Sequence, residues 1–204
     1  MIRAVVLDIG SVLEIIDDTV FPAPFEQRHA LPPGSVHAGA ETFPGDAGLG
    51  ELTEAQVRAH WQQHLGLSDA QADELMVDYW RWYVGTLDQE LCDWFADQRP
   101  ARKTGILSNS GSGAREAERC WGFEGITDDI VYSHEVGLRK PDPRIYLLAA
   151  ERLGVRPEEI VFLDDVPGHV EAAREAGWHA VVHRTTPESI REVDRIVEEQ
   201  PLRR

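Results

Sequence analysis

The chain has few cysteines, few basic residues and no long apolar run. Only two of its 204 residues are cysteine, Cys92 and Cys120, and both lie in helix-like segments among apolar neighbours. Two buried thiols in a reducing cytosol are therefore expected rather than a disulfide framework, since a chain of this length can bury a sufficient core unaided. No stretch approaches the roughly 18 apolar residues of a membrane span, and the first apolar run is too short for a signal peptide. A cytoplasmic location with no membrane partner is the resulting expectation.

Basic side chains are also scarce, numbering 20 against 36 acidic ones, which gives a formal net charge of −16. Such acidity argues against a nucleic acid, or an anionic membrane surface, as a partner held by charge. The apolar fraction of 42%, with six Trp and six Phe, argues against intrinsic disorder. We expect one domain, or one domain carrying an insertion, as a monomer or homodimer. An anionic substrate would require a site that reverses the sign of the charge locally.

Five short apolar runs predict buried strands of a parallel sheet with helices on both faces. They span residues 4–8, 105–109, 130–133, 160–164 and 179–183. Helix signals separate the later runs: Asp142 and Pro143 supply an N-cap and a first-turn proline, and Gly154 supplies a stop. This alternation predicts an α/β fold, with a Rossmann-like, doubly wound parallel sheet. Residues 201–204 are expected to fray at the C-terminus.

The alternation breaks after the first predicted strand. About ninety residues separate that strand from the second, whereas one crossover needs roughly a dozen. Residues 19–50 are rich in proline and glycine, and capping-box patterns then begin helices after Thr53 and Ser68. A further helix, predicted at 88–98, returns the chain to the sheet. An insertion that is mainly helical follows from this pattern.

The sequence therefore predicts two domains. Residues 1–16 and 86–204 form the α/β core, and residues 17–85 form a helical cap inserted after the first strand. Linkers near residues 14–18 and 84–88 would allow the cap to move as a lid.

Polar residues stand at the points where the predicted strands end. In an open parallel sheet, ligands bind outside the carboxyl ends of the strands. The candidates there are Asp8, Ser108, Asn109, Asp164 and Asp165, together with Lys140 just before a helix. Three carboxylates cannot remain ionised together unless a pKa rises or a cation binds, and Mg²⁺ is the simplest ion for oxygen ligands. A carboxylate beside Mg²⁺ and a lysine can attack a phosphoryl group covalently.

In this order, the segments resemble the haloacid dehalogenase (HAD) superfamily of hydrolases, in its helical-cap subclass. The matching motifs are Asp-Ile-Gly-Ser-Val-Leu at 8–13, Leu-Ser-Asn at 107–109, Lys-Pro at 140–141 and Phe-Leu-Asp-Asp at 162–165. The resemblance covers residues 1–16 and 86–190. Residues 136–146 followed by 162–165 are most similar to bacterial glucose-1-phosphate phosphatases and the N-terminal phosphatase domain of soluble epoxide hydrolases. The resemblance implies a Mg²⁺-dependent phosphatase acting on a small phosphate ester, with sugar phosphates among the candidates.

The resemblance also implies roles for the polar residues. Asp8 would be the nucleophile that forms an aspartyl-phosphate. Ser108 and Asn109 would bind the oxygens of the transferring phosphoryl group, and Lys140 would stabilise their charge. Ser108, Lys140 and Asp8 would thus form the catalytic set.

The implied metal ligands come from two of the motifs. Asp8, the carbonyl of Gly10 and Asp165 would ligate Mg²⁺, and Asp164 would bind it directly or support it. His169 stands where family members often have a second acid or an asparagine, so no role is assigned to it.

One departure from the family pattern concerns proton transfer. Family phosphatases usually have a second aspartate two residues after the nucleophile as general acid and base, and here that residue is Gly10. Because a positioned acid or base contributes roughly 10²–10⁴-fold in rate, we hypothesise that leaving groups needing no protonation are favoured, such as anomeric or aryl phosphates. Glu14, Asp17 and Asp18 follow the nucleophile and are candidates for a substitute proton donor, although loop carboxylates are usually just solvated.

Two other functions remain open. A 2-haloacid dehalogenase would use Asp8 to attack carbon, and such enzymes also lack the second aspartate. The pair Asp164 and Asp165 counts against it, because a dehalogenase needs no metal and paired carboxylates would repel its anionic substrate. A catalytically weakened binding or regulatory domain would explain the missing acid, but the retained nucleophile, lysine and carboxylates count against it.

The aromatic segment of the cap has its own two interpretations. Tyr79, Trp80 and Tyr83 share faces of a predicted helix. We expect them to pack the cap against the core rather than to line a substrate pocket. Arg81, between them, is expected to be exposed.

Overall fold

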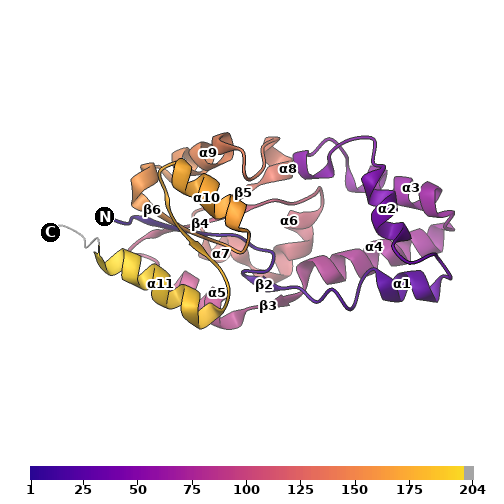
Figure 1. Ribbon diagram of the computed structural model, residues 1–204, viewed down its shortest axis with the longest axis horizontal. Helices are drawn as coiled ribbons and strands as arrows, with labels where there is room; N and C mark the ends of the chain where they lie inside the picture. The colour runs from indigo at the N-terminus through magenta and orange to yellow at the C-terminus, as the bar shows by residue number, and fades with distance from the viewer. Residues whose placement is uncertain (200–204) are drawn as a thin grey trace.

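The computed structural model describes residues 1–199, and the predicted frayed end at 201–204 lies outside them. Within the described residues, a five-stranded parallel sheet has the order β5-β4-β1-β6-β7. Its strands are β1 (Ala4–Leu7), β4 (Lys103–Ser108), β5 (Asp129–Tyr132), β6 (Ile160–Asp164) and β7 (His179–Val182). All five predicted strands are present, with ends within two residues of those expected. The predicted α/β fold with a doubly wound sheet is confirmed (Figure 1).

Helices cover both faces of the sheet. The core helices are α5 (Gln89–Ala96), α6 (Ala114–Ala117), α7 (Phe123–Ile126), α8 (Ser133–Val136), α9 (Pro143–Leu153), α10 (Pro167–Glu175) and α11 (Thr186–Glu199), with 3-10 turns η2 (Glu118–Trp121) and η3 (Pro157–Glu159). The predicted signals of α9 are confirmed, since Asp142 caps its start through the Arg144 N–H and Gly154 ends it at φ 63°. Such local signals set the helix ends independently of the sheet.

The central strand shows how the two faces become separate cores. Val5 and Leu7 pack with α5, α7 and α11, whereas Ala4 and Val6 pack with α9 and α10. Successive side chains of a strand point to opposite faces, so a strand covered on both sides is apolar throughout. The carboxyl end of β1 is therefore held between two packed layers.

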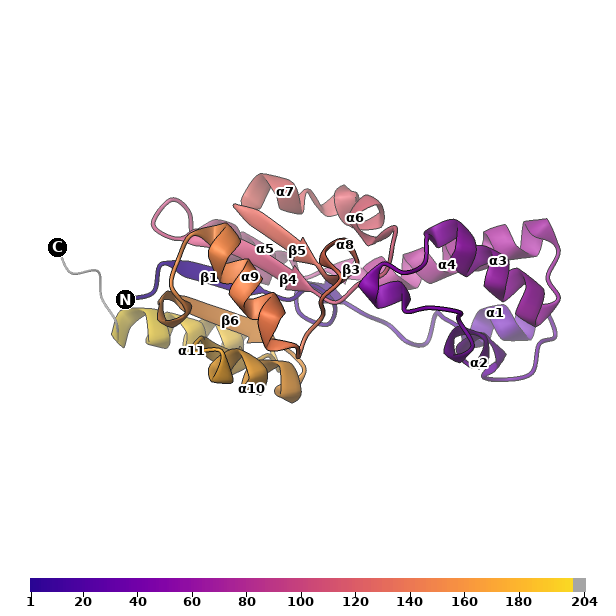
Figure 2. The same ribbon diagram turned by 90° about the horizontal axis from the view of Figure 1, so that it is seen from above.

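The helical insertion lies at the carboxyl end of the sheet, away from the N-terminus (Figure 2). Its elements are α1 (Ala23–Arg28), α2 (Ser35–Glu41), η1 (Ala47–Leu49), α3 (Glu54–Leu65) and α4 (Asp69–Val84). Both predicted capping boxes form, at Thr53 with Gln56 and at Ser68 with Gln71. The insertion has a hydrophobic cluster of its own, and every member of this cluster lies between residues 21 and 82.

The chain leaves and re-enters the sheet domain through a short antiparallel ribbon. It consists of β2 (Glu14–Ile15) and β3 (Thr86–Leu87). The exact division into core and cap at residues 16 and 86 stays a prediction.

A third connection joins the cap to the core, formed by residues 46–52, which we call the cap clasp. Its contacts are the Asp46–Arg139 ion pair at 2.6 Å, the Ser133 hydroxyl donating to the Gly48 carbonyl at 2.7 Å, and the Ser112 hydroxyl donating to the Leu52 carbonyl at 2.7 Å. Ser112 lies in the loop after β4, Ser133 begins α8 directly after β5, and Arg139 follows α8, all beside the predicted site. The lid motion predicted from the two linkers would have to open this clasp as well.

Neither cysteine forms a disulfide. Cys92 is buried as expected, but Cys120 is exposed at the end of η2, so the expectation of two buried thiols is wrong for Cys120. Within residues 1–199, no helix is both long and apolar enough to span a membrane.

Candidate active site

The predicted site residues meet at the carboxyl edge of the sheet. Asp8 directly follows β1, and Ser108 and Asp164 end the two strands that flank β1. Parallel strands end at the same edge, so neighbouring strands bring these three side chains together. Asp8 and Ser108 border a cleft of about 360 Å³, which is lined by Asp8, Gly10, Ser11, Ile16, Asp18, Trp82, Tyr83, Ser108 and Asn109.

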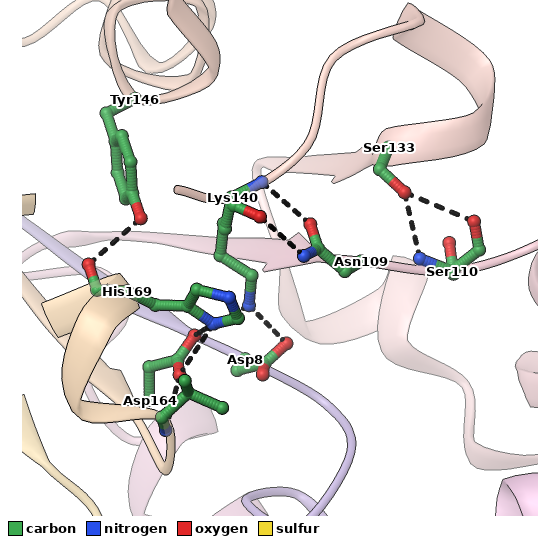
Figure 3. A network of polar contacts seen from close by, with 9 residues as sticks. Asp8, Asn109, Ser110, Ser133, Lys140, Tyr146, Asp164 and His169 are labelled. Atoms are coloured by element: carbon green, nitrogen blue, oxygen red, sulfur yellow. Dashed lines mark hydrogen bonds and ion pairs between the residues drawn. The ribbon is translucent and has the colours of Figure 1, made fainter. Parts of the chain in front are cut away.

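Lys140 is the cation at the centre of the site (Figure 3). Its Nζ lies 2.8 Å from Asp8 Oδ1 and 2.6 Å from Asp164 Oδ2. The lysine is only 2% exposed. Burial raises the pKa of Asp8 to about 6, although Lys140 opposes this shift. One buried ammonium thus forms ion pairs with two carboxylates.

Asn109 holds the backbone of Lys140. Its side-chain Nδ2 donates to the Lys140 carbonyl at 2.9 Å, and its Oδ1 accepts the Lys140 N–H at 2.8 Å. Both ends of the amide are therefore engaged (Figure 3). The predicted contact of Asn109 with phosphoryl oxygens stays a prediction, and the structure adds a positioning role that sequence reasoning missed.

Asp164 is completely buried and contacts several donors besides Lys140. Its Oδ1 accepts the Val166 N–H at 2.8 Å and lies 3.1 Å from Nδ1 of His169. Tyr146 in turn donates its hydroxyl to the His169 carbonyl at 2.9 Å. Burial raises the pKa of Asp164, but the hydrogen bonds from His169 and Lys140 hold it below its usual value. His169, to which the sequence assigned no role, thus orients a candidate ligand.

A divalent cation fits the remaining donor set. Among the described residues, Asp8, Asp164 and Asp165 each place one carboxylate oxygen within 4.8 Å of the others. Burial, and next the charge of Asp164, raise the pKa of Asp165. Three carboxylates thus face the single ammonium of Lys140, and a hard cation with oxygen ligands would supply the missing positive charge. The donors fit Mg²⁺, and Gly10, whose carbonyl was predicted as a ligand, lines the same cleft.

The cap contributes aromatic side chains to the cleft wall. Trp82 and Tyr83 line it, so the expectation that Tyr83 only packs the cap on the core is wrong. Trp80 does pack there, because its ring occupies the space where a Cβ on Gly113 would lie. Sequence reasoning did not single out Trp82, although its position next to Tyr83 on α4 was a usable signal.

The candidates for a substitute proton donor are placed differently. Asp18 lines the cleft and accepts the Trp82 indole N–H at 3.0 Å. Asp17 is exposed and bonds to Thr19. Glu14 is only 1% exposed and is therefore not a solvated loop carboxylate.

The fold and the site are those of a hydrolase with an aspartate at its centre. The haloacid dehalogenase-like hydrolase family model matches residues 2–177, and the chain belongs to this family. The helical cap and the parallel sheet agree with this assignment.

Individual relatives cover parts of the chain. A phosphatase of Mycobacterium tuberculosis is 33% identical over 129 residues, which is 58% of this chain and 55% of that protein. Bifunctional epoxide hydrolase 2 of Sus scrofa is 39% identical over 75 residues, 37% of this chain and 14% of that protein. The chain thus matches about half or less of the length of these relatives.

A solved structure supports the fold over nearly the whole chain. A HAD family enzyme of Bacteroides thetaiotaomicron, in complex with magnesium and inorganic phosphate, superposes with a TM-score of 0.72 at 21% identity. The match covers 90% of this chain and 95% of that one.

Proposed function

We propose that this hydrolase is a Mg²⁺-dependent phosphatase that cleaves small phosphate monoesters through an aspartyl-phosphate on Asp8. The observation that carries the proposal is the meeting of Asp8, Asp164 and Asp165 around one buried ammonium at the carboxyl edge of the sheet. The phosphatases among the relatives and the neighbour solved with magnesium and phosphate support it.

Asp8 would be the nucleophile. Its Oδ1 is held by Lys140, which leaves Oδ2 to form a bond to phosphorus as the ester P–O bond breaks. Lys140 and Ser108 would stabilise the charge on the phosphoryl oxygens. Asp8, the Gly10 carbonyl and Asp165, with Asp164, would hold Mg²⁺, which when bound neutralises charge on the phosphoryl group. Water then attacks phosphorus, releases inorganic phosphate and regenerates the Asp8 carboxylate.

The cleft composition favours this reaction over dehalogenation. A 2-haloacid carries a carboxylate, which needs a cationic partner. The charged residues that line the cleft are Asp8 and Asp18, and the nearby Lys140 already contacts two carboxylates. The phosphate group of an ester can bind the proposed Mg²⁺. A carboxylate on the leaving group would instead be repelled by Asp18 in the cleft wall. We therefore propose a small metabolite with an uncharged leaving group as the substrate.

The proposal is tested with p-nitrophenyl phosphate and a panel of sugar phosphates, each assayed with Mg²⁺ and with EDTA. Activity should fall by at least a hundredfold with EDTA and in Asp8→Asn, which removes the nucleophile while keeping the size of the side chain. Activity that survives either change would overturn the proposal. Chloride release from 2-chloropropionate without metal would instead identify a dehalogenase.

A further inference from the structure

A pair of buried glutamates lies close to the catalytic cleft. Glu118 in η2 and Glu14 in β2 are each 1% exposed. Glu118 Oε2 accepts the Tyr132 hydroxyl at 2.5 Å, and Glu14 Oε1 accepts the Trp121 indole N–H at 3.0 Å. The second oxygen of each carboxyl group is buried with no hydrogen-bond partner in the described part of the chain. Such carboxyl groups are costly to bury as anions, so a retained pair calls for an explanation.

Tyr83 connects these carboxyl groups with the cleft. Its side chain lines the cleft beside Asp8, and Glu118 is the charged group that acts most strongly on its hydroxyl. Burial, followed by the charge of Glu118, raises the pKa of Tyr83 well above its usual value. Tyr79, Glu14 and Asp8 raise it further. The phenol therefore remains protonated and serves as a hydrogen donor at the cleft wall.

The pKa of Glu118 suits a proton donor that works near neutral pH. Burial raises its pKa to about 7, against the opposing hydrogen bond from Tyr132. Of the charged groups around it, Asp8 raises this pKa and Arg115 lowers it, while Glu118 and Glu14 repel each other as anions. A group whose pKa lies near the working pH is the most effective acid or base.

On the basis of the proposed function, we propose that Tyr83, backed by Glu118, supplies the proton that Gly10 cannot. As the ester P–O bond breaks, the Tyr83 O–H gives its proton to the leaving oxygen, and the Glu118 carboxyl proton moves to the Tyr83 oxygen. When water attacks the aspartyl-phosphate, its proton returns along the same path to Glu118. The cycle closes with no net proton change in the protein.

The relay changes the expectation drawn from Gly10 alone. With a donor in place, alkyl phosphates become substrates, because their poor leaving groups are protonated as they depart. Tyr83 touches the substrate in this scheme and is catalytic, whereas Glu118 acts through Tyr83 and is a positioning residue and proton store.

Tyr83→Phe tests the first part, because it removes the hydroxyl but keeps the ring. We expect kcat on an alkyl phosphate such as glycerol 1-phosphate to fall by roughly 10²-fold or more. The loss on p-nitrophenyl phosphate, whose leaving group needs no proton, should be at least tenfold smaller. The matched control is Tyr79→Phe, one turn earlier on α4, whose ring contacts Tyr83 at 5.9 Å but does not line the cleft. It should leave the ratio between the two substrates as in the unaltered enzyme.

Glu118 is tested through the pH profile. The kcat/KM of the unaltered enzyme on the alkyl phosphate should fall as pH rises through about 7, because the relay needs protonated Glu118. Tyr132→Phe removes a hydrogen bond that stabilises the carboxylate, so this decline should move to higher pH. In Glu118→Gln, the decline should disappear. Thermal unfolding of each variant verifies that the fold is retained.

The possible results separate the relay from the proposed function. Equal losses on both substrates in Tyr83→Phe would overturn the relay, since the phenol would then only shape the cleft. A decline that stays in place in Tyr132→Phe would overturn the assignment to Glu118. An unaltered enzyme that hydrolyses no phosphate ester at all would refute the proposed function itself, and the relay with it.

Discussion

Lys140 shows how one side chain can serve both the fold and the chemistry. It is buried between Asp8 and Asp164, so its charge is compensated only while both carboxylates remain. Removing one partner of a buried ion pair is strongly destabilising because it leaves an uncompensated charge. Arginine would not replace it, since a planar guanidinium cannot occupy the place of a compact ammonium with the same contacts.

The position of that ammonium depends on Asn109. In Asn109→Ala, both hydrogen bonds to the Lys140 backbone are lost, so the lysine loop should shift. Because small displacements of catalytic groups can cost about 10²-fold in rate, we expect kcat to fall by at least tenfold. Steady-state kinetics with p-nitrophenyl phosphate measure this, with thermal unfolding as the control for folding. An unchanged kcat would mean that the clamp does not position Lys140.

Glu14 makes stability depend on pH. Burial, and next the charge of Glu118, raise its pKa from 4.5 to about 9. A carboxyl group whose pKa is raised in the folded state holds its proton more tightly there, so stability is lost as pH rises between these values. In Glu14→Gln this loss is removed. The stability of the variant relative to the native chain should therefore rise by up to about 1.4 kcal/mol per pH unit.

Urea unfolding at pH 6, 7 and 8 measures this difference. Gln89→Glu, on the exposed surface of α5, is a control whose difference from the native chain should vary little with pH. Parallel stability curves for Glu14→Gln and the native chain would show that Glu14 does not keep its proton in the folded state.

At the level of elements, local signals predicted the skeleton of the fold. The apolar runs of the strands, the Asp142 cap and the two capping boxes depend on neighbours in sequence, and each is present as expected. The convergence of Asp8, Ser108 and Asp164 followed from the rule that parallel strands end at one edge. These predictions needed no knowledge of distant contacts.

The remaining features of the site depend on contacts between distant segments. Asn109 bonds to a residue 31 positions away, and Glu14 bonds to Trp121, 107 positions away. Neither pairing has a periodic or local signature. The sequence therefore predicted that Asp8, Ser108 and Asp164 would meet, but not the bonds of Asn109 to the Lys140 backbone or the place of Tyr83 in the cleft wall.

The cap clasp provides a test at the same level. Gly50 has φ +76°, and a Cβ there would overlap the carbonyl oxygen of His134. Gly66, which ends α3, has φ +66° but open space around it. Gly66→Ala should therefore cost only the backbone penalty of roughly 1–2 kcal/mol, whereas Gly50→Ala should cost more and also lower activity.

Urea unfolding gives the free energy of unfolding of each variant, and phosphatase assays give its activity. The difference in stability between Gly50→Ala and Gly66→Ala reports the clash at the clasp, since both share the strained φ. Equal costs in the two variants, with equal activity, would show that the clasp does not couple the cap to the core.

For the whole molecule, the charge of −16 and the proposed anionic substrate are compatible because the two act at different places. Most ion pairs of the described chain join partly exposed side chains, which contribute little individually. The buried ion pairs of Lys140 with Asp8 and Asp164 lie instead at one edge of the sheet. The charges of the site itself therefore determine which substrate it binds, and the proposed Mg²⁺ would add the positive charge that the site lacks.

The proposed mechanism requires that Asp8 carries the phosphoryl group during turnover. Rapid acid quenching of the enzyme during turnover, followed by mass spectrometry of its peptides, tests this directly. With Mg²⁺ present, we expect a phosphoryl group on the peptide that contains Asp8, formed at least as fast as turnover and absent in Asp8→Asn. Phosphate release with no phosphoryl group on Asp8, or with one on another residue, would contradict it.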